Sequence, residues 1–151
     1  MMLVGIAQAD VPSNVADTKL TAELRGLEGN KEAEINALVK NMGTVGFSTV
    51  AANTHIENFY YEKFKEKGVE MISFFGLVNK EKLRTLLLAN PDFGAYAPFN
   101  FLTYKTLDNK TDDNTWFGHL APDTMLDIIG EKNADTRKEF TDMIAGWDDY
   151  D

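Results

Sequence analysis

Residues 71–78 read MISFFGLV, a short run that is apolar on both of its alternating faces. Such a run is typical of a central strand that is covered on both sides. The neighbouring segments carry their apolar residues at helical spacing instead. Earlier in the chain, one helix face is indicated at positions i, i+3, i+4 and i+7: Ile35, Leu38, Val39 and Met42. After the strand, a helix is expected over residues 79–89. It ends there because Pro91, two residues later, cannot continue a helix. Strand and helices therefore share one apolar core.

A capping box marks a further helix between these two. Thr54 and Glu57 have the threonine-to-glutamate spacing that closes the first turn of a helix. This helix would end at Gly68, and its expected apolar face consists of Ile56, Phe59, Tyr60 and Phe64. The remaining predicted elements are strands at 45–52, 99–106 and 115–120, a hairpin connection at 108–114, and helices at 122–130 and at the C-terminal end.

The predicted order of elements is α-β-α-β-α-β-β-α-α. It indicates a single α+β domain with a mixed sheet of about four strands and helices mainly on one face. We divide the chain into four parts: 1–9 as the remnant of a signal peptide, 10–30 as a polar lead-in, 31–147 as the α+β domain and 148–151 as an acidic tail.

Composition excludes several classes of function. The net charge of -9 disfavours nucleic acid and anionic lipid as partners, because both are polyanions. The chain has no cysteine, so disulfides, thiol nucleophiles and thiolate metal sites are excluded. No stretch approaches the roughly 20 apolar residues that span a membrane.

The opening residues, MMLVGIAQA, suggest a cellular location. Ala7-Gln8-Ala9 has the small-x-small pattern that signal peptidase cleaves after, which would make Asp10 the mature N-terminus. The apolar run before it is too short for a working signal and lacks a basic segment. Either the chain begins inside a longer signal, or residues 2–7 form a strand. The first alternative predicts a periplasmic or secreted protein and the second leaves the cytoplasm open.

The two histidines are the first candidates for chemistry. The capping box places His55 in the first turn of a helix, where the helix dipole would lower its pKa and keep the ring neutral. His119 lies at the end of the last strand and faces the same side as Phe117. Metal or haem binding would need the two histidines together, and they lack the spacing of a metal motif. We predict no cofactor and keep His55 and His119 as weak candidates for metal or haem.

The segment 53–105, together with HLAPDTMLDIIG at 119–130, resembles the domain of unknown function 302 family. That family has a histidine after its first core strand, and its next strand ends in a Phe-Gly or Asn-Pro element. A helix carrying leucines follows, then Asn-Pro and Leu-Pro elements before an alternating strand, and later a strand-to-helix junction of the form Asn-Pro-x-x-Met. The matching positions are His55, Phe75-Gly76 with Asn79, Asn90-Pro91, Ala97-Pro98, and Pro122 with Met125. Lys80 stands where the family often has proline, and Ala121 replaces an asparagine.

The resemblance implies a small bacterial α+β fold, a homodimer and export, but no established activity. We predict a non-catalytic domain that binds a small apolar or aromatic ligand, or a protein partner, in a cleft near His55 and the aromatic loop 93–101. Its predicted ligand-binding residues are Thr54, His55, Phe75, Asn79, Phe93, Tyr96 and Phe99. The alternatives are a hydrolase or isomerase with His55 as general base, which needs an acid within hydrogen-bond reach of the ring, and a haem or metal protein.

Overall fold

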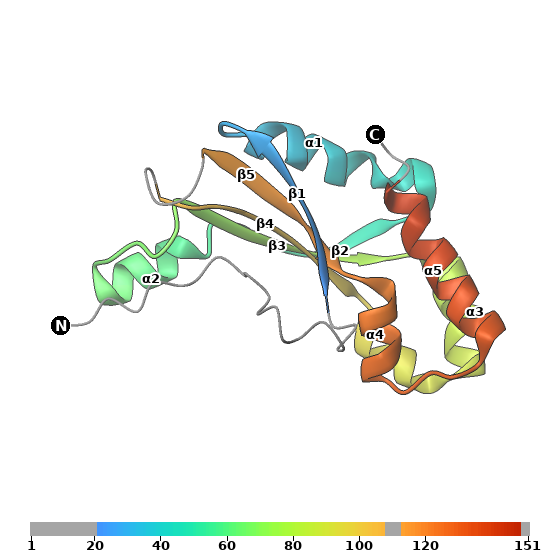
Figure 1. The fold of residues 1–151 in the computed structure, drawn as a ribbon. Coiled ribbons are helices and arrows are strands. Elements are labelled where there is room, and N and C mark those ends of the chain that lie inside the picture. The colour runs from blue at the N-terminus through green and yellow to red at the C-terminus, as the bar shows by residue number, and fades with distance from the viewer. Residues whose placement is uncertain (1–20, 108–112, 149–151) are drawn as a thin grey trace.

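The computed structural model describes residues 21–107 and 113–148, the side chains of 147 and 148 excepted. The predictions for 1–9, for most of the hairpin connection at 108–114 and for the end of the acidic tail therefore fall outside the described residues. The elements, in chain order, are β1 (Ala22–Glu28), α1 (Glu32–Asn41), β2 (Ser48–Asn53), α2 (Glu57–Phe64), β3 (Met71–Val78), α3 (Lys80–Ala89), β4 (Phe99–Lys105), β5 (Asn114–Leu120), α4 (Pro122–Ile128) and α5 (Ala134–Asp148), with 3-10 turns at Met42–Val45 and Pro91–Tyr96 (Figure 1).

The α+β class is confirmed, and the sheet is larger and more regular than expected. It has five strands in the order β1-β5-β4-β3-β2, and each neighbouring pair is antiparallel, so the prediction of a mixed sheet of about four strands is corrected. The additional strand is β1, which falls in the predicted polar lead-in. Its residues are nearly all exposed, so no alternation of apolar and polar residues announces it. It forms because its backbone pairs with β5 over its whole length.

The prediction of a central strand at 71–78 is confirmed. β3 lies between β4 and β2, and Met71, Ser73, Phe75 and Leu77 are all buried. The predicted strand at 45–52 begins later, at Ser48, because Gly46 takes a positive φ of 88° and ends a 3-10 turn there. The predicted helix at 79–89 forms as α3, and Asn79 caps it by accepting a hydrogen bond from the backbone N–H of Lys82 at 3.1 Å.

Four helices share the core with one face of the sheet. Buried side chains of α1, α3, α4 and α5 meet the inward-facing phenylalanines of β3 and β4. Phe75 and Phe101 lie with their ring centroids 6.2 Å apart, and Phe93 meets Phe140 at 5.2 Å. α2 contributes no described residue to this cluster and stands at the opposite end of the sheet from α3, α4 and α5 (Figure 1). None of the described helices is long and apolar enough to cross a membrane.

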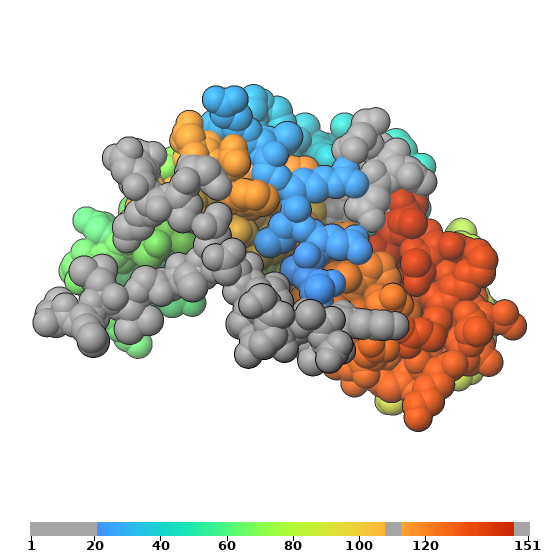
Figure 2. Space-filling view, in the orientation of Figure 1, coloured from blue at the N-terminus to red at the C-terminus, as the bar shows by residue number. Residues whose placement is uncertain are grey.

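The edge strand β1 lies at the surface (Figure 2) and is fitted closely to β5. Gly118 of β5 has a φ of +154°, and a Cβ atom at this residue would overlap the backbone oxygen of Glu23. A side chain at this position would therefore collide with the backbone of β1, which has no flexible end to move aside.

We predict that Gly118→Ala lowers the free energy of unfolding by about 2–4 kcal/mol, since it combines backbone strain with a steric clash. Gly146→Ala is the matched control. Gly146 lies in α5, and a Cβ atom there would have no other atom within 4 Å, so alanine should stabilise the helix by about 0.5–1 kcal/mol. Urea unfolding followed by circular dichroism measures both. Equal effects of the two substitutions would contradict the close fit of β1 on Gly118.

Candidate functional site

The candidate site begins where β2 ends. The last paired residue of β2 is Asn53, opposite Phe74. Two residues later His55 takes a left-handed φ of +54°, a conformation uncommon outside glycine, which turns the chain out of the strand direction. The backbone N–H of His55 donates to the hydroxyl of Ser73 on β3 at 3.1 Å. The turn is therefore held to the sheet by a side chain of β3.

Ile72 of β3 lies beyond the last residue that pairs with β2, yet both its backbone N–H and its carbonyl are hydrogen-bonded. Its carbonyl accepts from the N–H of Ile56 at 3.0 Å, and its N–H donates to Oε2 of Glu57 at 2.9 Å. A carboxylate oxygen thus occupies the place of a backbone carbonyl on the next strand. Because an unpaired buried N–H costs about 1–3 kcal/mol, this bond fastens the start of α2 to the sheet.

The predicted capping box is corrected by this arrangement. α2 begins at Glu57 with Ile56 before it, and no side chain caps its first turn. Glu57 is 3% exposed and turns toward β3 and His55, while Thr54 is exposed. The positive φ of His55 separates Thr54 from the helix, so the threonine hydroxyl cannot reach the first-turn N–H groups.

The imidazole of His55 lies between two carboxylates. Its Nδ1 is 2.9 Å from Oε1 of Glu57, and its Nε2 is 2.9 Å from Oε1 of Glu32, the first residue of α1. Only the imidazolium form can donate from both ring nitrogens at once. The Glu32–His55–Glu57 cluster therefore links the starts of two helices through one protonated ring.

Glu32 is brought to the ring by hydrogen bonds of Thr115 on β5. The hydroxyl of Thr115 donates to the carbonyl of Gly29 at 2.6 Å and accepts from the N–H of Lys31 at 3.0 Å. The side chain of Asn30, between them, accepts from the N–H of Glu32 at 3.1 Å. The loop between β1 and α1 is thus fixed to the sheet, and with it the position of Glu32.

The electrostatics of the cluster correct a second prediction. The hydrogen bond to Glu57 and the charges of Glu32 and Glu57 raise the pKa of His55, although desolvation opposes them. The expected lowering by the helix dipole is therefore wrong, because two carboxylates contact the ring directly. Burial alone would raise the pKa of Glu57, but the hydrogen bonds from the Ile72 N–H and His55 outweigh it and the pKa is lowered.

These contacts define what the ring can do. A general base needs a ring nitrogen with a free lone pair, and here both nitrogens face carboxylates. His119 cannot complete a histidine metal site with it, because β4 and β3 lie between His119 and β2, a separation of three strand spacings or roughly 14 Å. Among residues 21–107 and 113–148, no group of three or more His, Cys, Asp or Glu side chains is arranged so that it could hold a metal ion.

A pocket opens beside the cluster, between α2 and the start of β3. It has a volume of about 430 Å³. We call it the α2 pocket, and it is lined by Glu57, Tyr60, Phe64, Glu66, Gly68, Val69 and Ile72. Glu57 belongs to both the cluster and the pocket. Tyr60 and Phe64 lie on the same face of α2 as Glu57, at i+3 and i+7.

The structure distributes the sequence-predicted site residues over two ends of the sheet. Asn79 follows the far end of β3, roughly 20 Å of strand away from Ile72 and Ser73, which His55 and Glu57 contact. The aromatic members lie in or against the core: Phe75, Phe93 and Phe99 are at most 5% exposed, and the Tyr96 hydroxyl donates to the carbonyl of Met125 at 2.9 Å. Of the predicted set, His55 contacts the pocket residue Glu57, and none of the set belongs to the lining of the α2 pocket.

Sequence reasoning missed the partners of His55 and most of the pocket. Glu57 was assigned to a capping box, although its place two residues after a histidine also suits a carboxylate–histidine pair. In the sequence, Glu32 is only an acidic residue in the first turn of a helix, and nothing there indicates that it contacts His55. The pocket residues Glu66 and Val69 lie in a loop with no pattern.

The fold and this site define a small α+β domain with a charged cluster beside a pocket at one end of an antiparallel sheet. A solved structure has the same fold: the crystal structure of the uncharacterised conserved protein DUF302 from Bacillus stearothermophilus, with a TM-score of 0.70 and 12% sequence identity over 85% of this chain and 94% of that chain. The fold that the resemblance implied is thereby confirmed. No protein-family model matches the sequence, and no curated protein matches it. The homodimer and the export stay predictions.

We predict that stability falls with rising pH because of His55. A raised folded-state pKa means that the stabilisation is fully present below the ordinary value of 6.5 and is lost as the pH rises through the folded-state pKa. Glu32→Gln should lower the pKa of His55 and flatten this fall. NMR titration of the ring and urea unfolding between weakly acidic and weakly alkaline pH measure the two quantities.

The matched control is Glu34→Gln, which removes a carboxylate from the same turn of α1. Glu34 pairs with Lys31 at 3.0 Å and not with the imidazole. It should leave the His55 titration nearly unchanged. Equal shifts in the two variants would show that the general charge of α1, and not the contact with Glu32, sets the pKa of His55.

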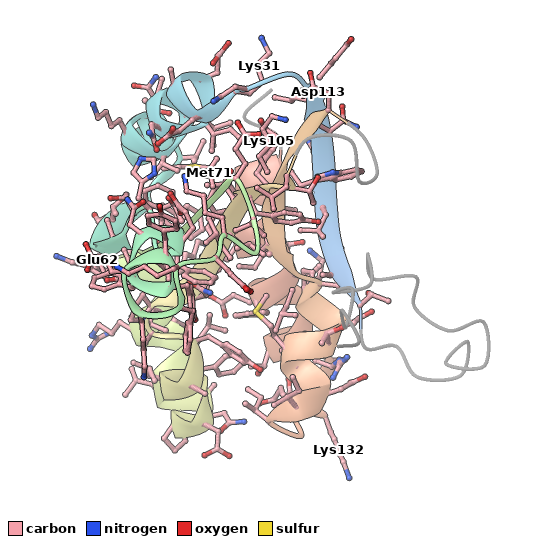
Figure 3. All side chains as sticks on the ribbon, turned by 90° about the vertical axis from the view of Figure 1, so that its left-hand side faces the viewer. Lys31, Glu62, Met71, Lys105, Asp113 and Lys132 are labelled. Carbon is pink, nitrogen blue, oxygen red and sulfur yellow. The ribbon has the colours of Figure 1, made fainter. Side chains whose placement is uncertain are left out.

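We predict that Glu57→Gln lowers the free energy of unfolding by about 2–3 kcal/mol, because the amide cannot accept from both His55 and the Ile72 N–H. Glu62→Gln on the same helix (Figure 3) should change it by no more than about 0.5 kcal/mol, since Glu62 is exposed. Chemical denaturation measures both. A loss no larger than that of Glu62→Gln would contradict the role of Glu57 in holding α2.

Proposed function

We propose that the protein is a binding domain that takes a small, largely apolar ligand in the α2 pocket without transforming it. The observation that carries the proposal is the position of Glu57. Glu57 lines the pocket, and its carboxylate is held by His55 and by the backbone of β3. A pocket wall held in this way is organised before a ligand arrives, which reduces the free-energy cost of binding.

The size and lining of the pocket support this proposal. Its volume of about 430 Å³ lies within the range of small-molecule sites, about 300–1,000 Å³. Apolar and aromatic side chains dominate the lining, and a few polar groups accompany them, which is the usual composition of a ligand site. Tyr60 and Phe64 expose 54% and 60% of their surface, so the aromatic side of the pocket is accessible from solvent.

The alternative predicted from the sequence, an enzyme with His55 as general base, meets its first requirement. An acid lies within hydrogen-bond reach of the ring, since Glu57 contacts Nδ1 at 2.9 Å. However, Glu32 occupies Nε2, the nitrogen that would take a proton from a substrate. The raised pKa of His55 also favours the protonated ring, which is no base. We therefore favour binding over catalysis.

The test is a titration with 2-phenylethanol, a small neutral aromatic probe, followed by NMR. We expect the backbone amide signals of Val69 and Ile72 to shift in a saturable manner. Val69→Trp should fill the pocket and weaken binding at least about ten-fold, a change of about 1.4 kcal/mol.

Val50→Trp is the matched control, because Val50 is 51% exposed on the edge strand β2 and does not line the pocket. It should bind the probe as the unsubstituted protein does. Absence of saturable shifts, or equal losses in the two variants, would overturn the proposal. The dispersion of each amide spectrum reports whether the variant is folded.

A further inference from the structure

We infer that the ligand of the α2 pocket carries a positively charged group, so that its chemical class is an organic ammonium ion with an apolar or aromatic body. The inference rests on the proposed function and names the ligand class of the same site. It is drawn from the charges and rings that line the pocket, which are independent of the pocket volume.

The charged residues that line the α2 pocket are all acidic. Glu57 and Glu66 are carboxylates, and no lysine or arginine belongs to the lining. Glu66 is exposed and forms no ion pair with another of the described residues. With the imidazolium of His55 between Glu32 and Glu57, that cluster retains one net negative charge. An anionic ligand would be repelled from both sides.

Aromatic rings supply the second element of cation recognition. Tyr60 and Phe64 line the pocket from one face of α2. A cation within about 6 Å of a ring centre is attracted by the negative face of the ring. Phe64 already attracts an ammonium of the protein itself, because Nζ of Lys63 lies 5.4 Å from the ring centroid. Lys63 does not belong to the pocket lining, so its ammonium lies against the ring from outside the pocket.

Together these groups match the two ends of an amphipathic cation. The apolar surface of Val69 and Ile72 suits the hydrocarbon body, and the carboxylates and rings suit the ammonium. A neutral apolar ligand would contact Val69 and Ile72 but would gain no electrostatic attraction from the carboxylates and rings. The net charge of -9 would also raise the rate at which a cation reaches the site.

The experiment compares 2-phenylethylammonium with 2-phenylethanol, which has the same body and no charge, by NMR titration near neutral pH. We expect the ammonium to bind about ten-fold more tightly, and this preference to shrink as salt is added because Glu66 is exposed to solvent. Glu66→Gln should reduce the preference several-fold.

The matched control is Glu62→Gln, which removes the same charge from α2 at a position outside the pocket. It should leave the preference unchanged. Equal binding of the two probes overturns the inferred ligand class while the proposed function stands, whereas binding of neither overturns the proposed function. If the two variants lose the same preference, the overall charge of the protein attracts the cation, and the inference about Glu66 is wrong.

Discussion

The hydrogen bond from the backbone N–H of Ile72 to the carboxylate of Glu57 decides how this end of the molecule is built. β2 ends before it reaches the start of β3, and the unpaired edge would otherwise face the start of α2. Oε2 of Glu57 accepts the hydrogen bond that a carbonyl of a longer β2 would otherwise accept. Because Glu57 uses its other oxygen for His55, the ring is positioned by the same contact. His55 in turn reaches Glu32, so one backbone amide positions the start of α2 and the pocket wall, and the ring joins them to the start of α1.

Two buried charges lie at this end of the sheet, and each is stabilised in the same manner. Lys105, at the end of β4, has a side chain that is 4% exposed and pairs with Asp113 at 2.6 Å and Glu70 at 3.5 Å (Figure 3). Glu57 is equally buried and pairs with His55. A buried charge without its partner costs several kcal/mol. Neighbouring strand ends are thus fixed by ions whose partners come from other segments.

The order of elements after β1 was predictable from the sequence, because apolar periodicity of 3.6 or 2 reports a buried face directly. MISFFGLV and the Ile35–Met42 pattern are examples, and both elements formed where predicted. β1 was not predictable, since an edge strand held by backbone bonds shows no such period. The Glu32–His55 contact depends on how two loops meet in space, and no local pattern carries that information. The sequence predicts that the aromatic residues of loop 93–101 contact a ligand, yet Phe93 and Phe99 belong to the buried apolar core.

The separation of α2 from the core has an evolutionary consequence. Tyr60 and Phe64 line the pocket but belong to no part of the apolar cluster that stabilises the fold. Under the proposed function, exchanging them would change the specificity of the pocket with little loss of stability, whereas exchanging Glu57 is predicted to loosen the helix. The proposed binding function would therefore allow specificity to diversify by a few substitutions on one short helix, while the sheet, the four packed helices and the histidine cluster stay as they are.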